Sequence, residues 1–252
     1  MTNTSSDKFF YARLGDMVNQ AEKNGVSFSD FLDERQCAEA EKWCLNNVSG
    51  LMYSFWGGYP DSMRKMLAVY PDYYQDYIMQ DFPIQCLTFT YRKEDRLTHR
   101  DFLGTFMGLK LKRSVTGDII VGEGITQAFV TNVASKLIST TVSKIGHTGV
   151  KCITDRPFEM EVRQEFRTLS GTVASLRLDC LVSFATGLSR EKSAMLIRSD
   201  RVEINHLPAK SVSTEVSNSD VLSVRGYGKF ILSESGNLTR KNRIHITLKK
   251  FV

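Results

Sequence analysis

The chain has 252 residues and a formal net charge of +5. Its content of 42% hydrophobic and 24% charged residues is that of a folded protein and excludes an intrinsically disordered one. Its five scattered cysteines form no CxxC pair, which excludes a disulfide framework and a zinc ribbon and favours reduced thiols. No apolar run approaches the ~18 residues of a membrane span and the polar start MTNTSSDKFF lacks a signal-peptide core, so we expect a cytoplasmic protein.

Residues 1–80 are predicted to form a small α/β domain with both helices and strands. Apolar residues recur at helical spacing from Phe10 to Ala21, and Gly25 follows as a plausible C-cap. A second helix is expected over residues 33–46. The segments LMYSFWGGYP and MLAVYP are predicted strands, the first broken at its glycine pair. No reactive cluster is evident in this part.

Residues 81–156 show the element order βαββαβ. IQCLTFTYR alternates as a strand does and places Phe89 and Tyr91 on one face. The following elements are a helix in LTHRDFLGTF, strands in DIIV and QAFVT, a helix over residues 133–145 and a strand in VKCIT. This order predicts a ferredoxin-like domain, which is also the layout of RNA-recognition motifs. Phe89 and Tyr91 are candidate base-stacking residues, although the third strand lacks the aromatic pattern of those motifs and Phe129 is expected to pack in the core.

The stretch LTHRDFLGTF raises the question of catalysis, because HRD occurs in the catalytic loop of protein kinases. That signature requires an Asn five residues after its Asp, and Phe106 stands there instead. Thr98 and Asp101 have the spacing of a capping box, with Asp in place of the preferred Glu. We therefore predict that Asp101 stabilises a helix start, and RNA contact by His99 and Arg100 is the alternative. No catalytic residue is assigned.

Residues 157–173 are expected to form a connector or an additional strand before a C-terminal domain over residues 174–252. From Val173 onward the chain carries 13 Lys and Arg against seven Asp and Glu, a net charge of +6. The first 172 residues carry 20 and 21, a net charge of −1. This asymmetry indicates a polyanion-binding module at the C-terminus, although a merely solvated basic surface would have the same composition.

The C-terminal domain should begin with two helices. Apolar spacing predicts one helix after Ser175 and a second that Ser189 caps, in which the apolar run from Ala194 to Ile197 should be well buried. VEIN and VLSVRG are short predicted strands. Guanidinium and ammonium groups gather at the ends of these elements, where they suit phosphate ligands. They belong to Arg177, Arg190, Lys192, Arg198, Arg201, Arg225, Lys229, Arg240, Lys241 and Arg243.

This domain resembles the alpha-L RNA-binding domain, the module named after the small-subunit ribosomal protein S-four. The shared features are Arg177-Leu178-Asp179, Ser189-Arg190, Ala194, Leu196-Ile197, Val202-x-Ile204-Asn205, Asp220 and Ser223-Val224-Arg225-Gly226. Asp200 and His206 depart from it, since the family usually has glycine before the Arg-Val pair and often after the Asn. For Asp179 and Asn205, satisfying backbone groups at element ends is the alternative to RNA contact. The resemblance implies an RNA-contacting surface made by Arg177, Ser189, Arg190, Lys192, Arg198, Arg201 and Asn205.

The whole chain is similar to the YlmH-type RNA-binding proteins of bacteria. The similarity lies in LTHRDFLGTFMGLKLKRSVTGDIIV, in SLRLDCLVSFATGLSR, and in SVRGYGKF with the TRKNR that follows. It implies association with the large ribosomal subunit, where the protein would contact ribosomal RNA and tRNA. It also implies a role in ribosome-associated quality control of stalled subunits that carry peptidyl-tRNA, beside a factor that extends the nascent chain.

The expected function is therefore that of a non-enzymatic, monomeric binder without cofactor or metal. Pseudouridine synthases have a catalytic Asp in a similar R-L-D context, but Asp179 is followed by Cys-Leu-Val-Ser, without the required Thr and Gly. The four histidines have no metal-binding spacing. Two alternatives stay open: an enzyme that modifies rRNA or tRNA, and a protein-interaction adaptor, for example in cell division.

Overall fold

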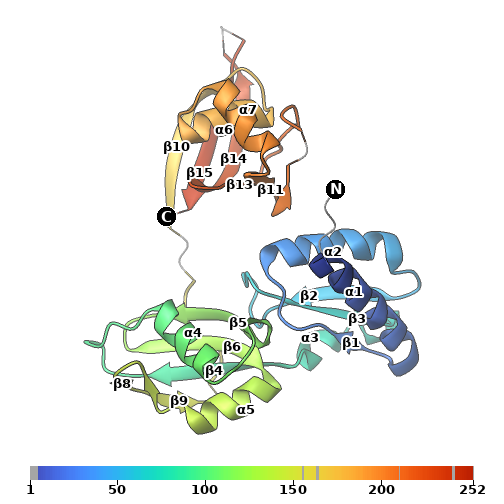
Figure 1. Ribbon diagram of the computed structural model, residues 1–252, viewed down its shortest axis with the longest axis vertical. Coiled ribbons are helices and arrows are strands. Elements are labelled where there is room, and N and C mark those ends of the chain that lie inside the picture. Colours follow the sequence, from blue (N-terminus) through green and yellow to red (C-terminus); the bar gives the residue numbers. More distant parts are fainter. Residues whose placement is uncertain (1–4, 155, 163–164, 210, 240–241, 252) are drawn as a thin grey trace. The chain divides into compact units, whose positions relative to one another are not determined.

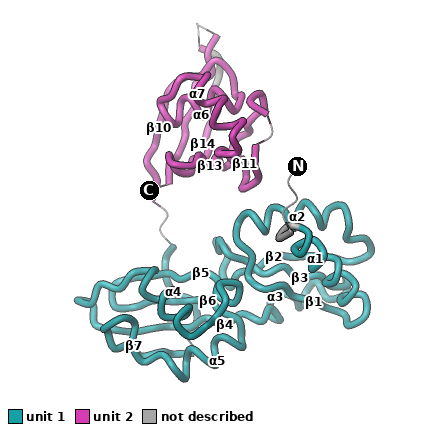
Figure 2. Tube along the Cα trace, in the orientation of Figure 1, with its two compact units in different colours: residues 1–162 teal, residues 163–252 magenta. Residues whose placement is uncertain are grey.

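The computed structural model describes residues 5–154, 156–162, 165–209, 211–239 and 242–251. The chain divides into two units, residues 1–162 and residues 163–252 (Figure 2). Each unit combines helices with antiparallel strands, which confirms the predicted α+β class. The further division of the first unit at residue 80 stays a prediction.

The N-terminal part of the first unit packs two helices on a three-stranded sheet with the order β1-β3-β2. In the central strand, Leu67 and Val69 belong to the core under the helices, whereas Met66 and Ala68 belong to a second core on the other face. The predicted C-cap is confirmed, because Gly25 has a φ of 90° and its N–H bonds the carbonyl of Ala21. The elements are α1 (Ser5–Asn24), β1 (Ser27–Phe28), α2 (Glu34–Asn47), β2 (Met52–Trp56), β3 (Met66–Tyr70), η1 (Asp72–Tyr74) and α3 (Ile78–Asp81).

The central part of the first unit has a four-stranded antiparallel sheet with the order β5-β6-β4-β9. Helices α4 and α5 share a core with one face of this sheet, where Phe89 packs against Phe102 and Phe106. The elements are β4 (Ile84–Thr90), α4 (His99–Gly108), η2 (Arg113–Val115), β5 (Thr116–Val121), β6 (Ile125–Thr131), α5 (Asn132–Thr141), β7 (Lys144–Ile145), β8 (Thr148–Gly149) and β9 (Lys151–Ile153) (Figure 1).

The opposite face of this central sheet is covered as well. Gln127, which is fully buried, donates from Nε2 to the Thr88 hydroxyl (2.9 Å) and to the carbonyl of Pro157 (2.8 Å). Its Oε1 accepts the backbone N–H of Glu159 at 3.0 Å. Residues 157–160 therefore lie over this face of the sheet and are held there by an amide side chain.

Aromatic rings complete this cover. The ring of Phe129 stacks on Tyr59 at a centroid distance of 5.1 Å and lies 5.2 Å from Phe158. Gly58 has a φ of 103°, and a Cβ there would lie 2.2 Å from the Phe129 ring. Only glycine fits this approach, and the expected core position of Phe129 is confirmed.

The second unit is a six-stranded antiparallel sheet with the order β10-β15-β14-β13-β11-β12 and two helices. Its core contains Leu181 and Val182 from α6 together with Ile246 and Leu248 from β15. The elements are β10 (Phe166–Val173), α6 (Leu178–Thr186), α7 (Arg190–Arg198), β11 (Val202–Ile204), β12 (Leu207–Pro208), β13 (Val221–Val224), β14 (Gly228–Leu238) and β15 (Ile244–Phe251).

The structure refines one prediction for this unit and contradicts another. Within the segment predicted to be a connector or a strand, Phe166–Val173 is an edge strand of the C-terminal sheet, paired along its length with β15. The prediction that the whole apolar run in α7 is buried was wrong for Met195, whose exposed fraction is 55%, while Ile197 is buried. Helix α7 packs through one side only, so one residue of four consecutive apolar residues faces away from the core.

Candidate nucleic-acid interface

Helix α6 begins where a distant loop supplies its first hydrogen-bond acceptors. The N–H groups of Leu178 and Asp179 donate to the carbonyls of Thr214 (2.8 Å) and Val212 (3.1 Å). The first N–H groups of a helix have no acceptor inside the helix, so such partners fix where and how it starts. The side chains of the first turn are thereby held on a rigid backbone.

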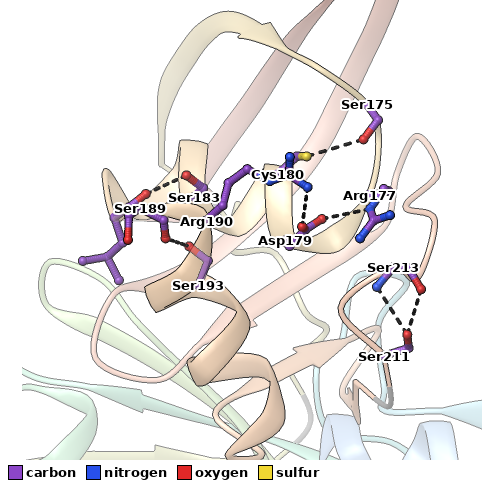
Figure 3. Close-up of polar contacts among 11 residues, drawn as sticks. Ser175, Arg177, Asp179, Cys180, Ser183, Ser189, Arg190, Ser193, Ser211 and Ser213 are labelled. Carbon is purple, nitrogen blue, oxygen red and sulfur yellow. Dashed lines mark hydrogen bonds and ion pairs between the residues drawn. The ribbon is translucent and has the colours of Figure 1, made fainter.

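Two arginines meet at one carboxylate at this helix start (Figure 3). Asp179 accepts from Nε of Arg177 at 3.2 Å and from Nη2 of Arg190 at 2.6 Å. The Asp179 side chain is only 8% exposed, whereas those of Arg177 and Arg190 are 43% and 57% exposed. The carboxylate therefore sits beneath the surface, and the two guanidinium groups lie on it.

The ion pairs decide the protonation of Asp179. Burial by itself would raise the pKa of this carboxyl, but the hydrogen bonds from Arg190 and Arg177 outweigh burial and lower the pKa below its ordinary value. In turn, the hydrogen bond to Asp179 raises the pKa of Arg190. At neutral pH the three groups carry a net charge of +1, and each guanidinium still has donors for a further acceptor. We name Arg177, Asp179 and Arg190 the arginine pair site.

The turn from α6 to α7 is tied down by small polar side chains (Figure 3). Ser189 caps α7, as predicted, by accepting the N–H of Lys192 at 3.3 Å, and its carbonyl accepts the hydroxyl of Ser193 at 3.0 Å. The hydroxyl of Ser183 donates to the carbonyl of Leu188 at 2.6 Å, and Gly187 between the helices has a φ of 73°. These contacts set the start of α7 and thus the position of Arg190 beside α6.

Asn205 has a structural role that accounts for its side chain. Its Nδ2 donates to Oδ1 of Asp220 at 2.8 Å, and its Oδ1 accepts the N–H of Val221 at 2.9 Å. This is the alternative expected for an Asn at the end of a strand. RNA contact by Asn205 stays a prediction, but both polar ends of its amide already have protein partners.

The two departures from the alpha-L pattern have a backbone explanation. Asp200 has a φ of 53° and His206 a φ of 65°, so both lie in the left-handed region. Glycine enters this region without the steric penalty that a Cβ brings. The positions where the family usually has glycine are thus the ones that need this conformation, which this chain reaches with other residues.

The remaining predicted RNA-binding residues are distributed over several elements. Lys192 and Arg198 are exposed on α7, and exposed Arg201 and Arg225 bond each other through their backbones. Lys229 is half-buried on β14. Arg243 ties two strands together, since its Nη2 donates to the carbonyl of Thr172 (2.6 Å) and its Nε to the Thr172 hydroxyl (3.0 Å). Arg240 and Lys241 lie outside the described residues.

In the central part, the structure corrects one predicted RNA contact. Phe89 is fully buried beneath α4, so it has no free face on which a base could stack. Tyr91 lies at the edge of the same core, and its hydroxyl donates to the carbonyl of Gly122 at 2.9 Å. The alternation was read correctly, but this face of the sheet is the one that the helices cover.

His99 and Arg100 are exposed at the start of α4. The predicted capping role is confirmed: Asp101 accepts the N–H and the hydroxyl of Thr98 at 2.8 and 2.7 Å, and these bonds lower its pKa. Although His99 is exposed, its imidazole is partly desolvated, and this desolvation is the main reason that its pKa is lowered. The positive charge of the nearby Arg113 guanidinium lowers the pKa further.

One polar cluster escaped the sequence analysis. Asp118 accepts the Tyr59 hydroxyl at 2.9 Å and the N–H groups of Met63 (2.6 Å) and Arg64 (3.2 Å). Arg64 and Arg113 both donate to the carbonyl of Thr116, at 3.0 and 2.5 Å. Apart from Arg113 and Thr116, which are three positions apart, these partners are more than fifty positions apart in the chain, so no local spacing could have indicated them.

No group of three or more metal-binding side chains occurs among the residues that the structure describes. Within the same residues, no helix has the length and apolar character needed to cross a membrane.

Known proteins resemble this chain in sequence and in fold. Residues 78–159 match the family model described as "Putative RNA-binding domain in YlmH". The chain is 28% identical over 240 residues to "Ribosome-associated protein quality control protein P2" of Bacillus subtilis (strain 168), covering 91% of this chain and 89% of that protein. The solved structure "Cell division protein ylmH from Streptococcus pneumoniae" has a TM-score of 0.54 at 22% identity, over 63% of this chain and 95% of that one, which shows a shared fold. This chain is therefore similar to YlmH-type proteins over most of its length, and its residues 78–159 match the RNA-binding domain model named after YlmH.

Proposed function

We propose that this chain is a non-enzymatic RNA-binding protein of the large ribosomal subunit, which contacts ribosomal RNA and tRNA during quality control of stalled peptidyl-tRNA complexes. It would act in the cytoplasm as a monomer, beside a factor that extends the nascent chain. The observation that carries the proposal is the arginine pair site, in which a buried carboxylate holds two exposed guanidinium groups. The family match and the name of the Bacillus subtilis relative support the same direction.

The arginine pair site suits a folded RNA backbone. A guanidinium presents a planar fork of donors that matches phosphate oxygens, and its charge persists at any physiological pH. Arg177 and Arg190 come from different helices but share Asp179, so their forks are organised before RNA arrives. Contacts of this kind position a protein on RNA without reading its sequence. Exposed Lys192 and Arg198 extend the positive charge along α7.

The central domain would contribute through a different surface from that of an RNA-recognition motif. Both faces of its sheet are covered, one by the helices and the other by residues 157–160 with the ring of Tyr59. His99 and Arg100 at the exposed start of α4 are therefore the proposed secondary RNA contacts.

The test is co-sedimentation with purified large ribosomal subunits, with and without bound peptidyl-tRNA, over a salt series. We expect binding that weakens by about 0.7–0.9 log units per log unit of salt for each phosphate neutralised. A preference for subunits with peptidyl-tRNA supports the quality-control role. The double variant Arg177→Glu, Arg190→Glu should lose binding while it stays folded.

A matched control is Lys136→Glu with Lys144→Glu, which makes the same change in net charge at two exposed lysines of the first unit. This control should bind nearly as well as the wild type. Equal loss in both double variants would show a dependence on net charge alone, and undiminished binding by the folded arginine variant would refute the assignment. A change in the mass of tRNA or rRNA after incubation with the protein would instead favour a modifying enzyme.

A further inference from the structure

The first unit contains a cavity of about 540 Å³ that the arginine pair site does not involve. Helix α1, the segment from β1 to α2, Arg64, and the Arg113–Ser114 turn line it. Pockets that hold small ligands have volumes of about 300–1,000 Å³ and combine apolar walls with a few polar groups. Its size and its walls, made from parts far apart in the sequence, are those of a ligand site.

Two arginines stand side by side at this cavity. Arg64 donates from Nε to the Thr116 carbonyl and from Nη2 to the carbonyls of Phe31 (3.1 Å) and Arg113 (3.4 Å). Arg113 donates from Nη1 to the carbonyls of Thr116 (2.5 Å) and Gly117 (3.2 Å). Among the described residues, no hydrogen bond is recorded for Nε and Nη2 of Arg113 or for Nη1 of Arg64. Carbonyls accept hydrogen bonds but carry no countercharge, so these donors suit an anion.

The charges around Arg113 also favour a bound anion. Burial lowers the pKa of Arg113 to about 10, and the positive charge of the neighbouring Arg64 is the second cause of this shift. The negative charges of Asp118 and Asp33 act in the opposite direction and raise the pKa, but by less. The two carboxylates are engaged elsewhere, Asp118 at backbone N–H groups and Asp33 as the cap of α2. A bound anion beside Arg113 would relieve this unfavourable desolvation.

The other walls complement a nucleoside. Phe10 is a half-buried ring in the lining and offers apolar contact to a base, whereas the ring of Phe28 packs against Phe82 in the core on the other face of the sheet. Asp16 and Asp30 are exposed carboxylates in the same lining, which can accept hydrogen bonds from the amino groups of a base. A simple inorganic anion would gain no binding energy from the Phe10 ring. The carboxylates of Asp16 and Asp30 would repel a second anionic group on the ligand.

We propose that this cavity binds a nucleotide, with its phosphate at Arg113 and Arg64, its base against Phe10, and base amino groups at the exposed carboxylates. The nucleotide is either free or part of an RNA strand, and both sources present the same chemistry. This inference goes beyond the proposed ribosomal function and does not rest on it, because the arginine pair site belongs to the second unit.

The experiment is isothermal titration of the full chain with the four nucleoside 5′-monophosphates, adenosine and inorganic phosphate. We expect saturable binding of at least one monophosphate, and at least about tenfold weaker binding of adenosine and of inorganic phosphate, because each lacks one of the two recognised parts. Trinucleotides that end in the preferred nucleotide separate the sources: tighter binding than the monophosphate means RNA, and weaker binding means a free nucleotide.

Variants connect the binding to the cavity. Arg113→Gln should weaken binding about tenfold or more, and Arg13→Gln, at an exposed lining position on α1, should weaken it by a smaller factor. Lys8→Gln removes the same charge from an exposed position of α1 that is not in the lining and should change nothing. If Arg113→Gln does not fold, the difference in nucleotide affinity between Arg13→Gln and Lys8→Gln tests the proposal instead.

Absence of saturable binding by any monophosphate, or equal affinity in Arg13→Gln and Lys8→Gln, overturns the proposal. Binding of inorganic phosphate as tight as that of the nucleotides also overturns it. The variant Arg177→Glu, Arg190→Glu should keep nucleotide binding, so failure of the ribosomal proposal and failure of this one are distinguishable.

Discussion

Replacing Asp179 by Asn tests whether this carboxylate positions the two arginines or only neutralises them. The substitution keeps the shape of the side chain and removes the charge that accepts from Arg177 Nε and Arg190 Nη2. Two opposite effects on RNA affinity follow. One negative charge disappears beside the presumed phosphate, which favours binding, while the arginines lose the partner that orders them, which opposes it.

The magnitudes decide between these effects. At the effective dielectric constant of about 20 that applies near a protein surface, a unit charge about 6 Å away changes the interaction with a phosphate by about 2.8 kcal/mol, and physiological salt roughly halves this. Ordering a side chain with many rotamers costs about 0.5–1.5 kcal/mol, and two side chains are involved. At the middle of this range the two side chains cost about 2 kcal/mol, which exceeds the screened charge effect by less than about 1 kcal/mol, so we expect RNA binding to weaken about threefold.

Fluorescence anisotropy with a ribosomal RNA fragment at fixed salt measures this change. The charge-matched control is Glu191→Gln, which removes an exposed carboxylate next to Arg190 without a recorded bond to it among the described residues. This control should bind equally or slightly more tightly. If folded Asp179→Asn binds as tightly as Glu191→Gln or more tightly, Asp179 is only a neutralising charge and the reasoning is refuted.

Three further predictions concern stability. Asp200→Gly should leave the free energy of unfolding in urea unchanged or raise it by up to about 1 kcal/mol, since it relieves a left-handed φ at some entropic cost; a clear loss would contradict this. Gly58→Ala should cost about 2–4 kcal/mol, measured in the same way, because its Cβ would meet the Phe129 ring at a φ of 103°; a neutral effect would show that the ring can move. Because the pKa of Asp179 is lower in the folded state than its ordinary 3.8, the stability it contributes is fully present above that pH and is lost as pH falls through the folded pKa. Thermal melts of wild type and Asp179→Asn should therefore converge below about pH 3.8, and parallel curves would exclude this linkage.

Local spacing was sufficient for the starts of α4 and α7 but not for every helix end, because the helix predicted over residues 133–145 ends at Thr141 and Lys144–Ile145 form β7. Asp101 stands three positions after Thr98 and bonds it, and Ser189 caps α7, because capping depends on residues within one turn. The burial of Phe89 could not be predicted from local spacing. Alternation shows which residues share a face of a strand, but only the tertiary structure shows what covers that face.

The same limit applies to the candidate site. The excess of cationic residues in the C-terminal domain could be counted in the sequence. The role of Asp179 as the shared partner of Arg177 and Arg190 could not be predicted, because it depends on the packing of α7 against α6. Likewise, the cluster of Arg64, Arg113 and Asp118 forms only when the N-terminal and central parts of the first unit meet. Long-range hydrogen bonds have no period in the sequence that could reveal them.

The covered sheet and the arginine pair site together determine where RNA recognition is expected. A sheet that binds RNA by stacking needs exposed rings on its open face, and here Phe129 is buried between Tyr59 and Phe158. To expose that ring, the protein would have to release residues 157–160 from Gln127 and leave a fully buried amide without its partners, at a cost of about 1–3 kcal/mol for each unsatisfied group. The arginine pair site needs no such rearrangement, because its guanidinium groups already lie at the surface. Phosphate contact in the second unit is therefore favoured over base stacking on the central sheet of the first unit.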